Sequence, residues 1–197
     1  MKHASKSGKT KHLLVETTKV LIMEKGCNRV TISDIMERSG LSKGAVYHHV
    51  KSKDELLALI LQERLEKINK RFFLEVNPDK PEFEGPLYQI VHDLPLLTDP
   101  NELTNQIFMY LISRNDQPMV KEILRSFYEQ GIQNSKEWIS QGQQAGVISS
   151  SVDKEKTSEL FTLITYGLRI RSLIAKEEET LQIEALIDFM RNTLRTK

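Results

Sequence analysis

Apolar residues recur along most of the chain at the three- and four-residue spacing of amphipathic helices. Near the start, Leu14, Leu21 and Ile22 form such a stripe and predict a helix over roughly 10–25, with Gly26 as its stop. The sequence shows neither a convincing alternating strand pattern nor an internal repeat. The pattern therefore predicts an all-α fold of about nine helices.

Two short helical patterns follow, joined by a turn at 39–42. Thr31 or Ser33 is a suitable N-cap for the first of them, and Gly40 is suited to end it. Ser42 is a natural N-cap for the second, whose inward positions include Val46. Two helices joined in this way form a helix-turn-helix, in which the second helix can enter the DNA major groove.

The rest of the chain predicts longer helices. One opens at Lys53 and ends before a proline-containing loop at 77–86, because proline interrupts helical hydrogen bonding. The further helices are predicted at 86–97, 101–113, from Pro118 to about Gly142, at about 154–175 and at about 180–195.

Charge is distributed unevenly along the 197 residues. Residues 1–53 hold 11 Lys and Arg against 4 Asp and Glu, a net +7, whereas residues 54–197 hold 17 against 23, a net −6. A basic N-terminal part before an acidic remainder indicates that residues 1–53 bind a polyanion. The single cysteine, the polar N-terminus and the lack of a long apolar run favour a cytoplasmic protein.

Residues 10–56 resemble the DNA-binding domain of the TetR family of bacterial transcriptional regulators. The matching positions are Thr31, Ile35, Gly40, Ser42, Lys43, Gly44, Tyr47, His49, Lys53 and Leu56, while Met36, Ser39 and Val50 depart from the family's usual residues. The resemblance implies a DNA-binding domain at 1–53 and a ligand-binding and dimerisation domain at 54–197. It also implies a ligand-responsive repressor that binds a pseudo-palindromic operator as a homodimer.

The candidate DNA contacts are small, hydroxyl-bearing, aromatic or basic residues around the two short helices. They are Thr31, Ser33, Ser42, Lys43, Gly44, Ala45, Tyr47, His48, Lys51 and Lys53. Lysines neutralise phosphates, and hydroxyl and imidazole groups donate to phosphate oxygens. Lys43 and Ala45 are expected to touch base edges. His49 is expected to pack within the DNA-binding domain.

The last two predicted helices are apolar over more than one stripe, which requires a second partner. The family resemblance implies that this partner is the same helix pair in another subunit; a helix buried in a large monomer is the alternative. The expected interface residues are Leu160, Ile164, Leu168, Leu186, Phe189 and Met190.

Aromatic residues along the middle helices are typical of ordinary core packing. The resemblance adds the expectation that some line a cavity for a small apolar effector, with Phe108, Tyr110, Phe127, Trp138, Phe161 and Tyr166 as candidates. The alternative is a DNA-binding protein of the same fold without a small-molecule effector, which is either controlled by a protein partner or used architecturally.

Motifs of catalysis are missing from the sequence. There is no nucleophile elbow, zinc motif or paired-cysteine site, and adjacent histidines such as His48 and His49 diverge on a helix. Ser7-Gly8-Lys9-Thr10 imitates the end of a phosphate-binding loop without its earlier glycine, and is expected to form a disordered arm. We therefore expect a protein without enzymatic activity, cofactor or metal.

Overall fold

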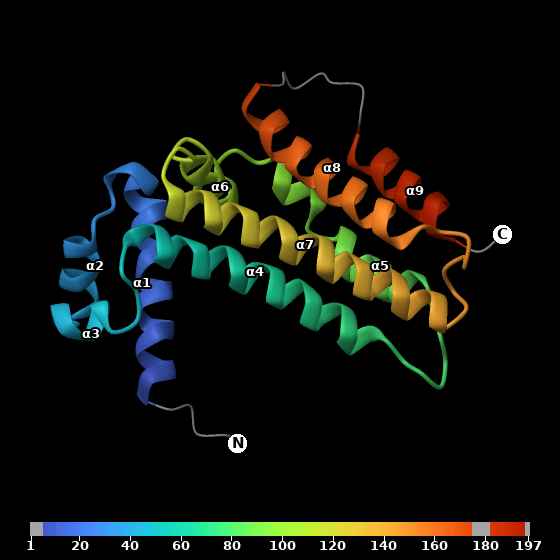
Figure 1. The fold of residues 1–197 in the computed structure, drawn as a ribbon, viewed down its shortest axis with the longest axis horizontal. Helices are drawn as coiled ribbons and strands as arrows, with labels where there is room; N and C mark the ends of the chain where they lie inside the picture. Colours follow the sequence, from blue (N-terminus) through green and yellow to red (C-terminus); the bar gives the residue numbers. More distant parts are fainter. Residues whose placement is uncertain (1–5, 175–181, 196–197) are drawn as a thin grey trace. The chain divides into compact units, whose positions relative to one another are not determined.

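The computed structural model describes residues 6–174 and 182–195, and these residues are predominantly helical (Figure 1). The helices are α1 (Lys6–Arg29), α2 (Ile32–Ser39), α3 (Lys43–Tyr47), α4 (Lys53–Glu75), α5 (Glu84–Val91), the 3-10 helix η1 (Leu94–Thr98), α6 (Leu103–Ile112), α7 (Pro118–Gln144), α8 (Lys154–Ile174) and α9 (Ile183–Leu194). In this part of the chain the only β pairing is an isolated bridge between Ile148 and Arg195. The predicted all-α fold is confirmed.

Some helix ends differ from the prediction. The helix expected at 86–97 ends at Val91, and the segment around Pro95 continues as the tighter η1. α1 is longer than expected and includes Ser7–Thr10, so the prediction of a disordered arm there was wrong. Gly26 nevertheless interrupts α1, with a φ of 76° that favours glycine. The predicted helix ends at 175 and 180 lie outside the described residues.

Capping residues define the helix-turn-helix. The Thr31 hydroxyl accepts a hydrogen bond from the Asp34 N–H at 3.2 Å, and the Asp34 carboxylate accepts one from the Thr31 N–H at 2.7 Å. These reciprocal bonds form a capping box at the start of α2. Gly40 ends α2 in the left-handed conformation, with a φ of 69°. Ser42 caps α3 by accepting from the Ala45 N–H at 3.3 Å.

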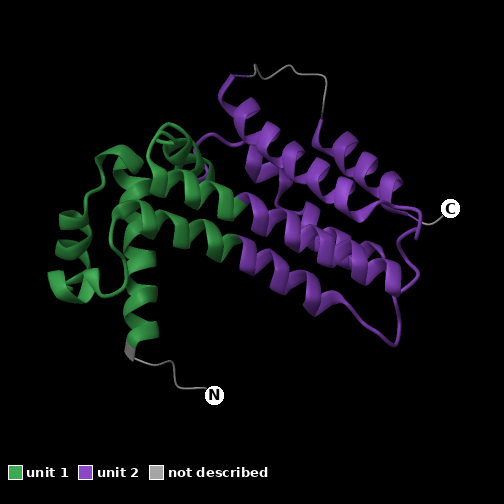
Figure 2. Ribbon diagram, viewed as in Figure 1, with its two compact units in different colours: residues 1–64, 103–127 green, residues 65–102, 128–197 purple. Residues whose placement is uncertain are grey.

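The chain divides into two compact units (Figure 2). Unit 1 comprises residues 1–64 and 103–127, so the helix-turn-helix shares its unit with the first half of α4, with α6 and with the start of α7. Its largest fully buried side chains are Leu14, Ile22, Val30, Ile35, Val46, Leu56, Leu57, Ile60, Leu61, Ile107, Phe108 and Leu111. The expected division at residue 53, into a DNA-binding domain and a ligand-binding and dimerisation domain, stays a prediction.

Unit 2 comprises residues 65–102 and 128–197. Its core consists of Leu87, Val91, Leu94, Ile139, Ile148, Phe161, Leu168, Leu186, Met190 and Leu194. Within this unit the Trp138 indole donates to Asn69 Oδ1 at 2.7 Å, and Arg71 pairs with the buried Asp93 carboxylate. No helix among the described residues is long and apolar enough to cross a membrane.

Candidate nucleic-acid interface

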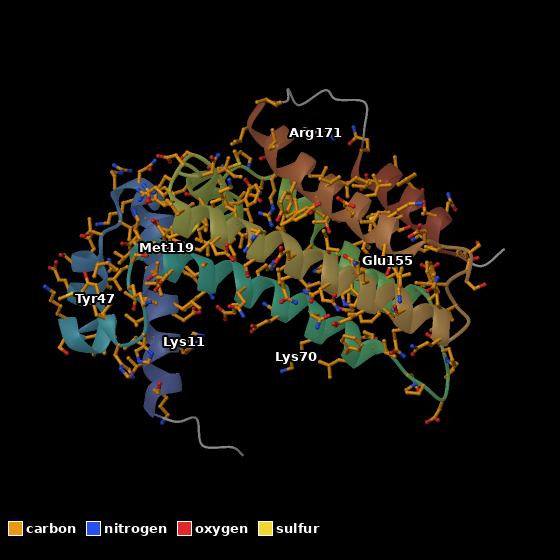
Figure 3. All side chains as sticks on the ribbon, viewed as in Figure 1. Lys11, Tyr47, Lys70, Met119, Glu155 and Arg171 are labelled. Atoms are coloured by element: carbon orange, nitrogen blue, oxygen red, sulfur yellow. The ribbon has the colours of Figure 1, made fainter. Side chains whose placement is uncertain are left out.

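Helix α3 and the residues beside it form an exposed polar surface on unit 1. Ser42, Lys43, Gly44, His48 and Lys51 are exposed, and so is the aromatic side chain of Tyr47, at 46% (Figure 3). We call these six residues the recognition surface. All six were predicted as DNA contacts, and the structure brings them together on one short helix and its flanks.

The helical period explains which residues face outward. Val46 and Val50 are buried in the unit 1 core and hold α3 against it. Lys43 and Tyr47 lie one turn apart on the open side, with the Lys43 ammonium 6.0 Å from the centre of the Tyr47 ring. A β-carbon at Gly44 would meet no atom within 4 Å, so the backbone there is open to close approach by a ligand.

The two candidates at the start of α2 differ in their freedom to bind. The Thr31 hydroxyl donates to Asp34 Oδ2 at 2.6 Å and is engaged in the capping box, whereas the Ser33 side chain is exposed. Lys25 pairs with Asp34 at 2.7 Å. The Lys25 ammonium, together with the Thr31 hydrogen bonds, lowers the pKa of Asp34 to about 2. The capping box is therefore fully formed near neutral pH.

Lys53 was also predicted as a phosphate contact, and this role stays a prediction; in the structure its ammonium has partners within unit 1. Its ammonium donates to the Cys27 carbonyl at 2.8 Å and lies 4.4 Å from the centre of the Tyr110 ring. Desolvation by burial lowers the pKa of Lys53. Its charge is thus used to hold the first turn of α4 to the end of α1. Sequence reasoning could not show this, because Tyr110 is remote along the chain.

Ala45, expected at base edges, and His49, expected to pack within the domain, are both half-buried. Ala45 lies between the exposed and buried sides of α3, and His49 lies at the edge of the unit 1 core. The rings of His48 and His49 meet edge to face at 5.1 Å. The described residues contain no group of three or more His, Cys, Asp or Glu side chains that could hold a metal ion.

A second exposed surface, on α8 and α9 of unit 2, is apolar. Of the residues expected at a dimer interface, Leu160 and Phe189 are exposed and Ile164 is half-buried, but the other three belong to the core of their own unit. These three are Leu168, Leu186 and Met190. The exposed large apolar residues of the two helices, which we call the apolar surface, are Leu160, Leu163, Ile170, Leu173, Ile174 and Phe189.

The six predicted effector contacts are divided between the two units. Phe108, Tyr110 and Phe127 belong to unit 1, where the Phe108 and Phe127 rings lie 6.2 Å apart. Trp138, Phe161 and Tyr166 belong to unit 2, where the rings of Tyr128 and Tyr166 lie 5.7 Å apart. An effector site formed by these six residues stays a prediction.

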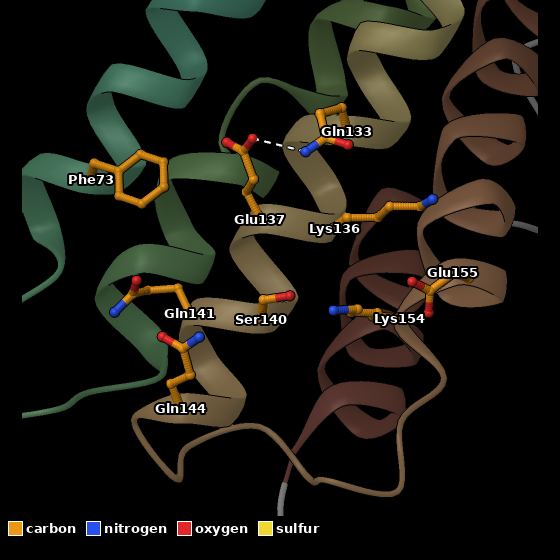
Figure 4. Close-up of a pocket in the computed structure, with 9 residues that line it drawn as sticks. All are labelled: Phe73, Gln133, Lys136, Glu137, Ser140, Gln141, Gln144, Lys154 and Glu155. Atoms are coloured by element: carbon orange, nitrogen blue, oxygen red, sulfur yellow. Dashed lines mark hydrogen bonds between the residues drawn. The ribbon is translucent and has the colours of Figure 1, made fainter.

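Sequence reasoning missed an open polar groove of about 500 Å³ in unit 2 (Figure 4). It is lined by Phe73, Gln133, Lys136, Glu137, Ser140, Gln141, Gln144, Lys154 and Glu155. Glu137 accepts a hydrogen bond from Gln133 at 2.9 Å, while neither Lys136 nor Lys154 forms an ion pair within the described residues. On the sequence these residues read as ordinary solvated helix faces, so no local signal marked them.

Comparison with known proteins identifies the helix-turn-helix. The family profile described as "Bacterial regulatory proteins, tetR family" matches residues 14–60, which contain all of α2 and α3. Residues 14–60 therefore form a DNA-binding domain of the TetR-family type. It is also 38% identical over 52 residues to the Transposon Tn10 TetC protein of Escherichia coli. That match spans 26% of each chain, about a quarter of the relative's length.

Solved structures extend the likeness to the whole TetR-family fold. Salmonella enterica GusR is 23% identical, with a TM-score of 0.68 over 98% of this chain and 99% of its own. A TetR transcription regulator from Haloarcula marismortui is 21% identical, with a TM-score of 0.68 over 95% and 99%. The SmeT–triclosan complex, whose protein comes from Stenotrophomonas maltophilia, is 16% identical, with a TM-score of 0.65 over 95% and 92%. At these identities the likeness shows the fold alone.

Proposed function

We propose that this protein is a transcriptional regulator that binds a pseudo-palindromic DNA operator as a homodimer. The observation that carries the proposal is the recognition surface, where α3 exposes Lys43, Tyr47 and His48 while Val46 anchors the helix in the core. A short helix held in this way can enter the major groove as a rigid reader. Its setting within a TetR-family domain supports this use.

Each side chain of the recognition surface has a distinct role in the proposal. Lys43 and Lys51 neutralise backbone phosphates, and Tyr47 and His48 donate hydrogen bonds to phosphate oxygens. The open backbone at Gly44 lets α3 approach the groove floor, where Lys43 and Ala45 meet base edges. Phosphate contacts set the affinity and register of binding, and the base contacts set its sequence preference.

The apolar surface on α8 and α9 supports a homodimer. Six large apolar side chains are exposed there on two neighbouring helices, more than an isolated chain needs for its own packing. A second copy contributes an identical surface, so a two-fold axis pairs like with like. The same axis would present two recognition helices to two half-sites of the operator.

The polar groove of unit 2 supports control by a small molecule. Amide, hydroxyl and charged side chains line it, with Phe73 as a single aromatic face. This lining, with Lys136 and Lys154 beside Glu137 and Glu155, favours a polar, charged effector in place of the apolar molecule expected from the sequence. The SmeT–triclosan structure shows a small molecule on a protein of the same fold. Such an effector releases a repressor only through different affinities for the DNA-bound and free conformations.

One observation favours a second candidate, a regulator of the same fold controlled by a protein partner. None of the six aromatic side chains expected to surround an effector lines the groove. In both candidates the protein acts in the cytoplasm by binding and not by catalysis. The two differ in whether a small molecule changes operator affinity.

The decisive experiment is selection of bound duplexes from a random DNA pool by the purified full-length protein, with light scattering to determine its oligomeric state. We expect an inverted repeat whose half-sites lie about one or a few helical turns apart, bound by dimers. Enrichment of no sequence, or of a single half-site by monomers, would refute the operator proposal.

Effector control is tested on that operator with a panel of polar metabolites. A compound that lowers operator affinity should lose its effect in the Lys136→Gln/Lys154→Gln double variant. The matched control is Lys156→Gln, a lysine on the same helix that pairs with Asp153 and does not line the groove. If active compounds act equally on both variants, the effector site lies elsewhere.

A further inference from the structure

Helix α1 starts well before the core of unit 1. Its first buried side chain is Leu14, although the helix begins at Lys6, about 12 Å earlier along its axis. Figure 1 shows these first turns extending past α3 at the lower edge of unit 1. We call residues 7–11 the α1 extension. Because it lies outside the core, packing alone does not explain why α1 is this long.

The α1 extension continues the core-facing side of the helix with polar groups. At about 100° per residue, Ser7 and Lys11 lie on the same side of α1 as Leu14 and Thr18. Leu14 and Thr18 are fully buried, whereas Ser7 and Lys11 are exposed. Leu14 belongs to the same buried cluster as Val46 of α3. The side of α1 that shares a core with α3 therefore continues, where it leaves that core, as a hydroxyl and an ammonium group.

The lysines of α1 differ in whether they have a carboxylate partner. Lys19 pairs with Glu63 at 2.7 Å. Lys9 and Lys11 are exposed, and neither ammonium forms an ion pair within the described residues. The first turn of α1 contains no acidic residue, and positive charge near the start of a helix opposes the helix dipole. Helix stability therefore does not explain these lysines, and an anion outside the chain is the partner that suits them.

The anion favoured by this position is the backbone of DNA. The α1 extension belongs to the same unit as the recognition surface, whose Lys43 and Lys51 are also exposed and without a carboxylate partner in the described chain. A helix in the major groove has a phosphate backbone on either side of it. A basic segment that extends past such a helix can reach this backbone while α3 contacts the bases.

We propose that the α1 extension is a second DNA contact of unit 1, in which Lys11 and Ser7 bind the sugar–phosphate backbone beside the half-site read by α3. Lys11 neutralises a phosphate, and the Ser7 hydroxyl donates to a phosphate oxygen. Lys9 lies about 160° around the helix from Lys11, on the opposite side, and takes no part in this contact. The inference rests on the proposed operator binding. It assigns to the α1 extension a share of the affinity but no base preference.

The test compares Lys11→Gln with Lys9→Gln in the full-length protein, on the operator selected by the wild type. Lys11→Gln should reduce the slope of log affinity against log salt by about 0.9 and weaken binding by about three- to tenfold at physiological salt. Lys9→Gln is the matched control, because it removes the same charge from the same part of α1. It should change the slope by less than about 0.3.

Thermal unfolding of the two variants separates DNA binding from stability. Each substitution removes a cation from the start of a helix, so the melting temperature should stay at or above the wild-type value. A third variant, Ser7→Ala, should weaken binding by about two- to threefold with an unchanged salt slope, since it removes an uncharged donor.

Two DNA measurements locate the contact. Hydroxyl-radical footprinting of Lys11→Gln should show less protection of the backbone beside each half-site. Repeating the DNA selection with this variant should return the wild-type inverted repeat, because phosphate contacts carry no base identity.

A wild-type salt slope in Lys11→Gln would overturn the inference, and so would a changed base preference in that variant. Equal reductions of the slope in Lys11→Gln and Lys9→Gln would also overturn it, because a general effect of positive charge does not depend on the side of the helix. If the wild-type protein itself selects no operator, the proposed function fails instead.

Discussion

The recognition surface on α3 and the apolar surface on α8 and α9 are both exposed, but they differ in chemistry. Around α3 the exposed groups are lysine ammonium, imidazole and hydroxyl groups and the backbone at Gly44. These groups are complementary to the phosphates and base edges of DNA. On α8 and α9 they are leucine, isoleucine and phenylalanine, which match another apolar surface. The comparison teaches that the chemistry of the exposed groups, and not exposure itself, indicates the kind of partner.

The largest effect is expected from the apolar surface. The double variant Leu160→Glu/Leu163→Glu should convert the proposed dimer to a monomer, because two buried carboxylates per subunit cannot be paired across the two-fold axis. Losing the second half-site should weaken operator binding by at least about 100-fold. Light scattering and operator titration measure the two effects. The control is Leu74→Glu, a change at an apolar residue of α4 that is 73% exposed; a loss of the dimer in this control would contradict the assignment.

The next effect is expected from the recognition surface. Lys43→Ala should weaken operator binding by about tenfold or more and also change the preferred base at one position of each half-site. Tyr47→Phe should weaken binding to all sequences by about three- to tenfold, since it removes one phosphate hydrogen bond. Repeating the DNA selection with each variant separates these outcomes. Lys70→Ala, on the unit 2 part of α4 (Figure 3), is the control and should bind like wild type.

Lys51 and Lys53 are close in sequence but differ in exposure, so their variants separate the effect of an exposed charge from that of a partly buried one. Lys51→Ala should reduce the slope of log affinity against log salt by about 0.9 with unchanged stability. Lys53→Ala should instead lower the free energy of unfolding by about 1.5 kcal/mol, through loss of its charged hydrogen bond to Cys27. Salt titrations and urea unfolding measure the two. If Lys53→Ala instead reduced the salt slope and left the stability unchanged, Lys53 would be a phosphate contact.

The smallest effect concerns the capping box at α2. Thr31→Ala should lower the free energy of unfolding by about 1 kcal/mol, measured by urea unfolding at neutral pH. The pKa of Asp34 is lowered from 3.8 to about 2, so the stability from its ionised carboxylate is present above about pH 4. That stability is lost as the pH falls from 4 to 2. Asp34→Asn should remove this part of the acid dependence; an unchanged acid profile would show that Asp34 does not contribute.

Much of the fold could be predicted from the sequence, because local signals carry it. Helical periodicity and capping residues lie within a few positions of each other, so Thr31, Gly40 and Ser42 mark the ends of α2 and α3 without tertiary information. The candidate DNA contacts from Ser42 to Lys51 could be placed for the same reason. The ends of α1 and α5 were less predictable, since packing and a single proline decide them.

By itself, the sequence determined an all-helical chain with a helix-turn-helix whose second helix carries basic and hydroxyl groups. Three contacts became known only from the tertiary structure. Lys53 donates to the Cys27 carbonyl, Leu168 packs in the core of unit 2, and Asp54 accepts from Arg114, 60 residues away. The physical reason is that helix formation depends on neighbours within one or two turns. Burial and ion pairing depend instead on residues that only the fold brings together.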